Sequence, residues 1–361
     1  MTDTLLPSAV AGLTYQPEAI EAELVCTAVR DETHDVKTIV LARDSAEPLA
    51  FLPGQYLTVT VEVDGEQLQR CYSIASASTG AAEVSLTVKR TAGGPVSSWL
   101  HDHLQPGDRL QVAGPFGVFS HAVHPAEKYL LLSAGSGITP VMSMLRTLAH
   151  RGEAADVVFV HSARTPADII FRHELEQLAT LPGCSVTVVC ESELPGEAWS
   201  GPTGLLSLRT LLTVAPDAYD REVFTCGPPG YMRAVRDLLE LAAVDPERCH
   251  EENFDLAARA GDTVDDGVEP PAGGERYAVR FLRTERTVEC HAGETILAAA
   301  RRHGLPLPSM CTQGMCGTCL TSLVEGQVDM QHAGGISRRQ VDEGKILACC
   351  SRPLGDVTLD A

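Results

Sequence analysis

The stretch Cys311-Thr-Gln-Gly-Met-Cys316-Gly-Thr-Cys319 decides how the C-terminal part of this chain folds. With Cys349 it gives the spacing C-x4-C-x2-C…C, which supplies four thiolates to a 2Fe-2S cluster, three from one tight loop and one from a distant strand. Gly314 and Gly317 let the amides of the loop approach the cluster sulfurs without a Cβ clash. We therefore predict four metal ligands: Cys311, Cys316, Cys319 and Cys349.

Two alternatives to this ligand set remain open. Zinc also binds four cysteines, but structural zinc sites usually have a close pair of cysteines at each end of the motif. Cys350 competes with Cys349 as the fourth ligand. We favour Cys349 because 29 residues separate it from Cys319 and because it follows the apolar stretch Ile346-Leu347-Ala348.

Composition narrows the class of protein. The chain has 361 residues, of which 44% are hydrophobic and 21% charged, values typical of a folded protein with two or three domains. The net charge of −20 predicts that neither nucleic acid nor a membrane surface is a partner. Residues 277–361 carry nine basic and nine acidic side chains, so residues 1–276 hold the whole excess. The first basic residue is Arg30, which argues against a signal peptide and predicts a cytoplasmic location.

The periodicity of apolar residues divides the chain into three parts. Residues 21–120 show short strands with period-two alternation, as in Leu57–Val63, which favours a small antiparallel β-barrel. From Lys128 onward buried strands alternate with helical stretches, which predicts a parallel sheet covered on both faces. The acidic, Pro- and Gly-rich residues 256–275 indicate a linker. The predicted strands of the first part are 22–29, 36–41, 56–63, 83–89 and 109–113. The predicted helices of the second part are 141–150, 169–179, 205–212 and 232–242, and a helix over 295–303 is predicted in the third.

Short motifs stand in a fixed order along the first two parts. The first is Arg70-Cys-Tyr-Ser73, and Val88-Lys-Arg90 follows it. Gly94-Pro-Val-Ser97 opens a predicted helix, whose free amides and dipole suit a pyrophosphate. Gly135-Ser-Gly-Ile-Thr-Pro140 lies between a buried strand and a helix, as a phosphate loop does. Cys226-Gly-Pro-Pro-Gly-Tyr-Met232 follows a later strand.

With these motifs ahead of the cluster motif, the chain resembles the ferredoxin reductase superfamily, in particular oxygenase reductase components. The resemblance covers residues from about 21 to 361. It implies a multidomain fold with an antiparallel β-barrel flavin domain, an α/β parallel-sheet nicotinamide domain and a β-grasp-like α+β ferredoxin domain. The expected boundaries are 21–124 for the FAD-binding domain, 125–255 for the NAD-binding domain, 256–276 for a flexible linker and 277–361 for the 2Fe-2S domain.

The resemblance also implies a flavin site. Arg70 pairs with flavin phosphate oxygens through its planar guanidinium, Tyr72 lies against the isoalloxazine ring, and Ser73 offers a hydrogen bond near N5. The alternative is an ordinary strand with a solvated Arg and a packed Tyr. FAD is favoured, with FMN as the alternative. The further flavin residues are Val88, Lys89, Gly94, Val96 and Ser97.

A nicotinamide site follows from the same resemblance. Cys226 is expected beside the hydride path, as a catalytic residue together with Tyr72 and Ser73, although a buried structural thiol is the alternative. Glu252 and Phe254 are expected near the flavin, with surface charge and core packing as the alternatives. NADH is favoured over NADPH, and Arg164 fits either the pyrophosphate or a 2′-phosphate. The remaining nucleotide-binding residues are Gly135, Gly137, Thr139, Pro140, Gly227, Pro228 and Met232.

The order of the motifs implies an enzyme. We predict an NADH-dependent reductase that takes two electrons from the nicotinamide and passes single electrons, through FAD and the 2Fe-2S cluster, to a separate terminal oxygenase of the Rieske type. The alternative electron acceptors are a haem-thiolate monooxygenase and a hybrid-cluster protein, and a non-enzymatic redox-sensing module is the third interpretation. The spacing of His101, His103, His121 and His124 matches no standard metal site, so we expect these histidines on the surface.

Overall fold

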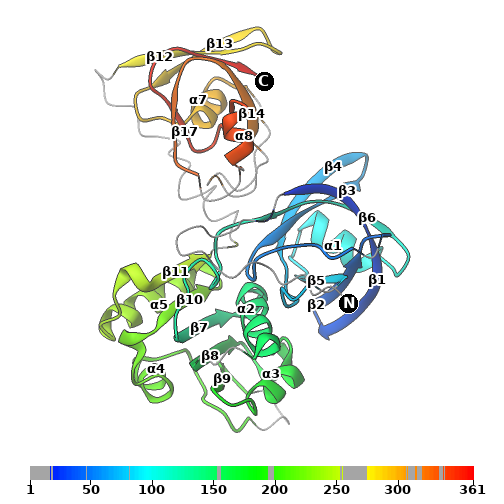
Figure 1. Ribbon diagram of the computed structural model, residues 1–361, viewed down its shortest axis with the longest axis vertical. Helices are drawn as coiled ribbons and strands as arrows, with labels where there is room; N and C mark the ends of the chain where they lie inside the picture. Colours follow the sequence, from blue (N-terminus) through cyan, green and yellow to red (C-terminus); the bar gives the residue numbers. More distant parts are fainter. Residues whose placement is uncertain are drawn as a thin grey trace, which may run out of the picture.

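The described residues form three large β-sheets, which follow one another along the sequence, and one two-stranded sheet (Figure 1). The expected linker lies outside the described residues except for its last two positions. The helices in the described part of the chain are too short or too polar to cross a membrane. The computed structural model describes residues 17, 19–45, 47–80, 82–152, 156–193, 199–252, 254, 275–305, 307, 314, 319–332, 336 and 338–361.

The first sheet is antiparallel, with strand order β4-β3-β6-β1-β2-β5. A bridge between Ile74 and Leu86 brings its two edge strands together, so the sheet rolls up as a barrel does. Strand β4 carries the Arg70–Ser73 motif and is absent from our predicted strands. Its polar sequence hides it, because an edge strand buries little apolar surface. The elements are β1 (Ile20–Thr33), β2 (Val36–Ala42), β3 (Tyr56–Val63), β4 (Glu66–Ser73), β5 (Glu83–Lys89), α1 (Pro95–Asp102) and β6 (Arg109–Phe116).

The second sheet is parallel, with strand order β11-β10-β7-β8-β9. The order reverses between β7 and β10, and such a switch point is where parallel sheets bind ligands at the carboxyl ends of their strands. Its elements are β7 (Lys128–Ala134), α2 (Ile138–Arg151), β8 (Asp156–Ala163), α3 (Arg172–Leu178), β9 (Cys184–Cys190), α4 (Leu208–Val214), β10 (Glu222–Cys226), α5 (Pro229–Leu241) and β11 (Cys249–Glu252), with short 3-10 turns η1 (Gly135–Gly137), η2 (Pro166–Asp168), η3 (Ala218–Asp220) and η4 (Pro246–Arg248).

The central strands of this sheet, β7, β8 and β10, are buried on both faces. Along β7, Leu131 packs into a core with helices α2 and α3, whereas Leu130 and Leu132 pack into a second core with α4 and α5. The alternation of side chains along each strand explains why the apolar stretches are nearly continuous. Helix α3 begins later than predicted, at Arg172, because Phe171 before it has a positive φ of 59°.

The third sheet is mixed, with order β13-β12-β18-β14-β16, and a small ladder pairs β15 with β17. Strands β12 and β18 run parallel, and α7 packs against β13. This arrangement of one mixed sheet and a short helix is the predicted α+β type. The elements are β12 (Arg276–Phe281), β13 (Arg286–His291), α7 (Ile296–Arg302), β14 (Leu320–Glu325), β15 (Val328–Met330), α8 (Arg338–Asp342), β16 (Lys345–Leu347), β17 (Ser351–Pro353) and β18 (Val357–Asp360).

The hydrophobic cores show how the three sheets relate. Val36, Ala75 and Phe119 of the barrel belong to the same core as α2 and β7 of the parallel sheet. By contrast, the core of the third sheet contains only residues from Val279 onward. The first two sheets are therefore joined by apolar packing that the third does not share among the described residues.

Candidate functional site

The barrel and the parallel sheet meet where three predicted site residues come together. Ser73 ends β4, and its hydroxyl donates to a carboxylate oxygen of Glu252 at 3.5 Å. Glu252 ends β11 and pairs in register with Cys226, the last residue of β10. All three side chains are buried. The end of the first motif thus lies at the carboxyl edge of the parallel sheet, beside its switch point.

Two glycines make this junction tight. A Cβ on Gly137 would lie 2.3 Å from the Cys226 carbonyl oxygen, and one on Gly227 would lie 2.6 Å from the Tyr231 ring. Real Cβ atoms cannot approach so closely, so only glycine allows the loop after β7 to lie against the segment after β10. The two predicted nicotinamide motifs are therefore in direct contact.

Burial controls the ionisation of the groups at this junction. It raises the pKa of Glu252 to about 8, while the hydrogen bond from Ser73 acts in the opposite direction. Burial and the charge of Glu252 raise the pKa of the Cys226 thiol well above its usual value. Cys226 is therefore a neutral thiol near neutral pH, not a thiolate nucleophile.

The predicted flavin residues Arg70, Tyr72, Val88 and Lys89 lie on β4 and β5. Burial raises the pKa of the Tyr72 phenol above its usual range. The Arg70 guanidinium donates to the Gln69 carbonyl at 2.7 Å. On β5, Val88 is fully buried and the Lys89 ammonium lies 3.3 Å from Asp35. Strand β5 also lies beside η1, the loop that contains Gly135 and Gly137.

The predicted pyrophosphate segment forms the start of α1. Gly94 is the N-cap of the helix, and a Cβ there would crowd Ser97 at 2.9 Å. The Ser97 hydroxyl accepts from the Thr91 amide and donates to the Gly94 carbonyl, so it stabilises this turn. Val96 is buried beneath it. The helix begins at Pro95 and has no acidic residue in its first turn, which leaves its positive end available for an anion.

The remaining nucleotide residues line two helix starts. Gly135 has a positive φ of 52°, and Thr139 donates to the Ser136 carbonyl at 3.0 Å in the first turn of α2, which also contains Pro140. Pro228 is the N-cap of α5, and Met232 in that helix is buried. Phe254 lies just beyond β11 and is 38% exposed.

The predicted cluster ligands are described only in part. Cys311 and Cys316 lie outside the described residues, whereas Cys319 and Cys349 are both buried in the third sheet's core. The Gly314 amide donates to Cys349 Sγ at 3.2 Å. Gly314 has a φ of 71°, and a Cβ on it would lie 2.7 Å from Cys350 Sγ. An amide aimed at a thiolate sulfur, with glycine required at that point, fits an iron–sulfur centre.

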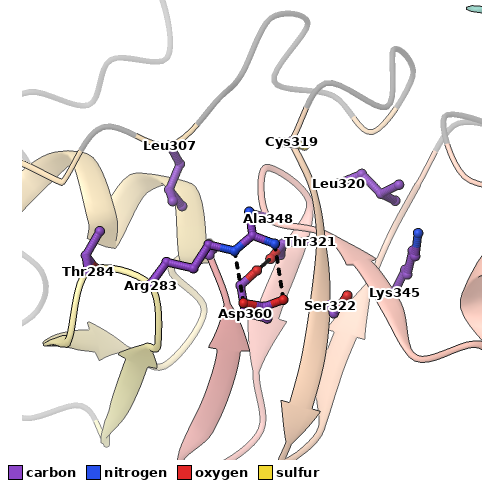
Figure 2. A pocket seen from close by; sticks show the side chains of 11 residues that line it. Arg283, Thr284, Leu307, Cys319, Leu320, Thr321, Ser322, Lys345, Ala348 and Asp360 are labelled. Carbon is purple, nitrogen blue, oxygen red and sulfur yellow. Dashed lines mark hydrogen bonds and ion pairs between the residues drawn. The ribbon is translucent and has the colours of Figure 1, made fainter.

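A cavity of about 430 Å³ lies beside Cys319 in the third sheet (Figure 2). The Arg283 guanidinium and the Asp360 carboxylate, which are 2.9 Å apart, cross it. Ala348, the residue before Cys349, also lines it. The cavity therefore adjoins the predicted ligands and is part of their surroundings.

The expectation of surface histidines is wrong for two of the four. His101 is buried and its Nε2 lies 2.9 Å from the Val88 carbonyl oxygen. His121 is also buried, and burial lowers its pKa to about 4. His124 is half-buried and stacks on His250. The sequence does not show this burial, because it depends on how His101 lies against β5 and His121 against Tyr129 in the fold.

Helix α2 joins the two domains in a way that sequence reasoning missed. Arg146 donates to the Ala75 carbonyl, Ser143 to the Ser76 carbonyl at 2.7 Å, and Thr147 accepts from the Ser78 amide at 2.9 Å. These partners directly follow the Arg70–Ser73 motif. One helix thus begins at the predicted phosphate loop and holds the chain that leaves the predicted flavin strand. The only sequence signal is the spacing of polar residues at 143, 146 and 147 on one helix face.

The turn after β8 carries an ion-pair group. Arg164 lies 2.8 Å from Asp168 and 3.7 Å from Asp35. Burial alone would raise the pKa of Asp168, but the hydrogen bond from Thr165 and the charge of Arg164 hold it below its usual value. The Arg164 charge is therefore already balanced by carboxylates.

Comparison with known protein families identifies all three parts. An oxidoreductase FAD-binding domain matches residues 23–121, an oxidoreductase NAD-binding domain matches residues 131–237, and a 2Fe-2S iron-sulfur cluster binding domain matches residues 279–354. The predicted order of cofactor domains is confirmed.

Relatives and solved structures agree with these matches. The glycine betaine monooxygenase reductase subunit of Pseudomonas aeruginosa is 43% identical, with 93% of this chain and 94% of that protein covered. The stachydrine N-demethylase reductase subunit of Rhizobium meliloti is 39% identical, with 94% and 96% covered. The fold of phthalate dioxygenase reductase matches with a TM-score of 0.57 at 24% identity, over 94% of this chain and 98% of that one. This chain therefore belongs to the family of oxygenase reductase subunits, oxidoreductases that join an FAD-binding, an NAD-binding and a 2Fe-2S domain in one polypeptide.

Proposed function

We propose that this chain is the NADH-dependent reductase of a Rieske-type oxygenase that attacks a quaternary ammonium compound. The junction of Ser73, Glu252 and Cys226 carries the reductase part of this proposal, because it joins the end of the flavin motif to the end of the nicotinamide motif. The substrate class rests on the relatives, whose names refer to glycine betaine and stachydrine, both quaternary ammonium carboxylates.

We assign FAD to the barrel. Arg70 and the start of α1, with Gly94, Val96 and Ser97, would hold the phosphates. Tyr72, Val88 and Lys89 would border the flavin ring. Ser73 would direct its hydroxyl toward the reacting edge of the ring, since its position at the end of β4 faces the parallel sheet.

We assign the nicotinamide dinucleotide to the switch point of the parallel sheet. Gly135, Gly137 and the first turn of α2 would take the pyrophosphate, and Cys226, Gly227, Pro228 and Met232 would border the nicotinamide. Arg164 is paired with Asp168 and Asp35, so a 2′-phosphate would meet two carboxylates there. This arrangement favours NADH.

The protein itself contributes by placing the nucleotide, the flavin and the cluster and by setting the charge around them. When bound, FAD and the 2Fe-2S cluster together convert a two-electron oxidation of NADH into single-electron steps. Glu252 is neutral below about pH 8 and so adds no negative charge where a negative nucleotide must bind. Cys319 and Cys349, with Cys311 and Cys316, would hold the cluster.

We also propose the domain limits 21–124, 125–255 and 277–361, with 256–276 as the linker. The three family matches lie within these domain limits.

Anaerobic titration of the purified protein tests the reductase part. We expect NADH to bleach both flavin and cluster absorbance, and NADPH to do so at higher concentration. A protein whose absorbance does not respond to NADH would contradict the proposal and favour a redox-sensing module.

Reconstitution tests the acceptor. With a glycine betaine monooxygenase oxygenase subunit and NADH, we expect glycine betaine to be consumed. Matched assays with a cytochrome P450 and with a hybrid-cluster protein serve as controls. If either of these accepts electrons faster than the oxygenase, the proposed partner is wrong, whereas the reductase assignment from the titration still stands.

A further inference from the structure

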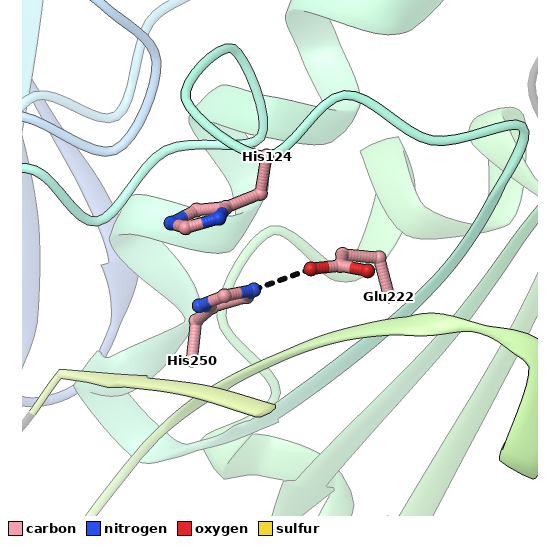
Figure 3. Close-up of side chains that lie close together, drawn as sticks. All are labelled: His124, Glu222 and His250. Carbon is pink, nitrogen blue, oxygen red and sulfur yellow. Dashed lines mark hydrogen bonds and ion pairs between the residues drawn. The ribbon is translucent and has the colours of Figure 1, made fainter. Parts of the chain in front are cut away.

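Two imidazoles and one carboxylate gather on the parallel sheet outside the proposed electron path (Figure 3). Glu222 is the first residue of β10, and His250 lies on the neighbouring β11. His124 comes from the connection between β6 and β7, which leads from the barrel to the sheet. Three segments far apart in the sequence thus meet at one point.

The three side chains are already close to one another. His250 Nε2 lies 2.6 Å from a Glu222 carboxylate oxygen. The His124 ring stacks on the His250 ring, with centroids 3.6 Å apart and planes 23° from parallel. One ligand atom from each residue lies within 4.8 Å of the other two. In Figure 3 the two rings lie one above the other, and the Glu222 carboxylate faces the edge of the pair.

The surroundings shield this group from solvent. The side chains of His250 and Glu222 are only 15% and 14% exposed. The Phe224 ring lies 4.8 Å from the His250 ring. Arg248 Nε lies 3.4 Å from one carboxylate oxygen of Glu222, and His250 contacts the other oxygen.

This donor set suits a particular class of ion. Two imidazole nitrogens and one carboxylate oxygen bind first-row divalent metals such as Zn²⁺, with water in the open position. Stacked imidazolium ions would repel each other, whereas neutral imidazoles offer lone pairs to a metal. The hydrogen bond in this group joins only His250 and Glu222, whereas the His124 ring contacts the His250 and Phe224 rings.

We propose that His124, Glu222 and His250 bind a divalent transition-metal ion of the Zn²⁺ type. The ion takes the place of the proton shared by His250 and Glu222, and the His124 ring turns its edge toward it. Binding connects the segment between the barrel and the sheet to β10 and β11. His250 lies two residues before Glu252 on β11, so the bound ion stabilises the junction between the two domains.

The test uses the flavin- and cluster-loaded protein and Zn²⁺ alone. Bound zinc is counted by equilibrium dialysis and elemental analysis for the wild type, His124→Asn and His250→Gln. His173→Asn is the matched control, because His173 is 93% exposed and lies on α3. The cysteines of this chain also bind zinc, so the result is the difference between variants.

We expect the wild type and the control to hold one more zinc ion per chain than either site variant. At this site their Kd for Zn²⁺ should be at least about tenfold lower than that of the variants. We also expect Zn²⁺ to raise the Tm of the wild type and the control but not of the two site variants. Flavin and cluster absorbance confirms that each variant is folded. Equal zinc content and equal Tm shifts in all four proteins would overturn the proposal, whether or not NADH reduces them.

Discussion

At the scale of single residues, the cluster motif raises the question of which neighbouring thiol is the fourth ligand. Cys349 accepts a hydrogen bond from the Gly314 amide, whereas the Cys350 thiol donates to the Leu347 carbonyl at 3.6 Å. A backbone amide directed at a sulfur stabilises a thiolate that binds iron. The two sulfurs therefore have different surroundings despite their adjacent positions.

We expect Cys349→Ser to lose most of the cluster absorbance, because a serine hydroxyl is a far weaker iron ligand than a cysteine thiolate. Cys350→Ser should retain it, which makes this variant the matched control. NADH-dependent reduction of ferricyanide should remain in both variants, since the flavin lies upstream. Loss of the cluster in Cys350→Ser alone would assign the ligand to Cys350.

Glu252 should make the stability of the protein depend on pH. Its pKa is raised from 4.5 to about 8, so the folded chain keeps a proton that the unfolded chain releases between these values. Stability then falls as the pH rises through this window. In Glu252→Gln no proton can be released, so we expect its Tm to fall less between about pH 5 and pH 8.

The release of flavin fluorescence on heating measures this difference. Glu251→Gln is the control, because Glu251 forms an ion pair with Arg236 at 2.6 Å on the outer side of the same strand. This control should keep the pH dependence of the wild type. If the Tm of all three proteins declined equally as the pH rises, Glu252 would be ionised in the folded state.

At the scale of elements, the turn between β8 and α3 should set the choice of nucleotide. Asp168 balances the charge of Arg164 at 2.8 Å. In Asp168→Asn the guanidinium keeps only the more distant Asp35, at 3.7 Å, and can bind a 2′-phosphate. We therefore expect the KM for NADPH to fall by about tenfold while the KM for NADH changes little.

Steady-state reduction of ferricyanide with each nucleotide gives both KM values. Glu176→Gln removes a carboxylate on the exposed face of α3 and controls for net charge. We expect no change in nucleotide preference there. A wild-type protein that already prefers NADPH would contradict this interpretation of the turn.

At the scale of the whole molecule, the distribution of cores predicts how the protein unfolds. The barrel and the parallel sheet share one core, and Arg146 joins them through Ala75, whereas the third sheet has its own core. We expect calorimetry to show two transitions, one for residues 21–255 and one for the ferredoxin domain.

Variants assign the two transitions. Arg146→Ala should lower the Tm of the larger transition, because it leaves the Ala75 carbonyl and Glu174 without their shared partner. Cys349→Ser should lower only the other Tm. A single transition that both variants shift together would show that the ferredoxin domain unfolds with the rest.

The sequence predicted the architecture well wherever the pattern is local. Period-two alternation located β3 and β5, and alternating strands and helices located the parallel sheet. In the first two parts it missed β4 and β11, which are short or polar and lie at sheet edges, where little apolar surface is buried. Edge strands form because a neighbouring strand offers hydrogen bonds, and that neighbour is not visible in their own residues.

By itself, the sequence determined the order of the cofactor domains, because cysteine spacing and glycine loops are local requirements of clusters and phosphates. Only the tertiary structure decided that Ser73 meets Glu252, that α2 joins the two domains, and that His124, Glu222 and His250 form one group. Such contacts depend on strand order and register, which bring distant residues together and leave no periodic trace in the chain.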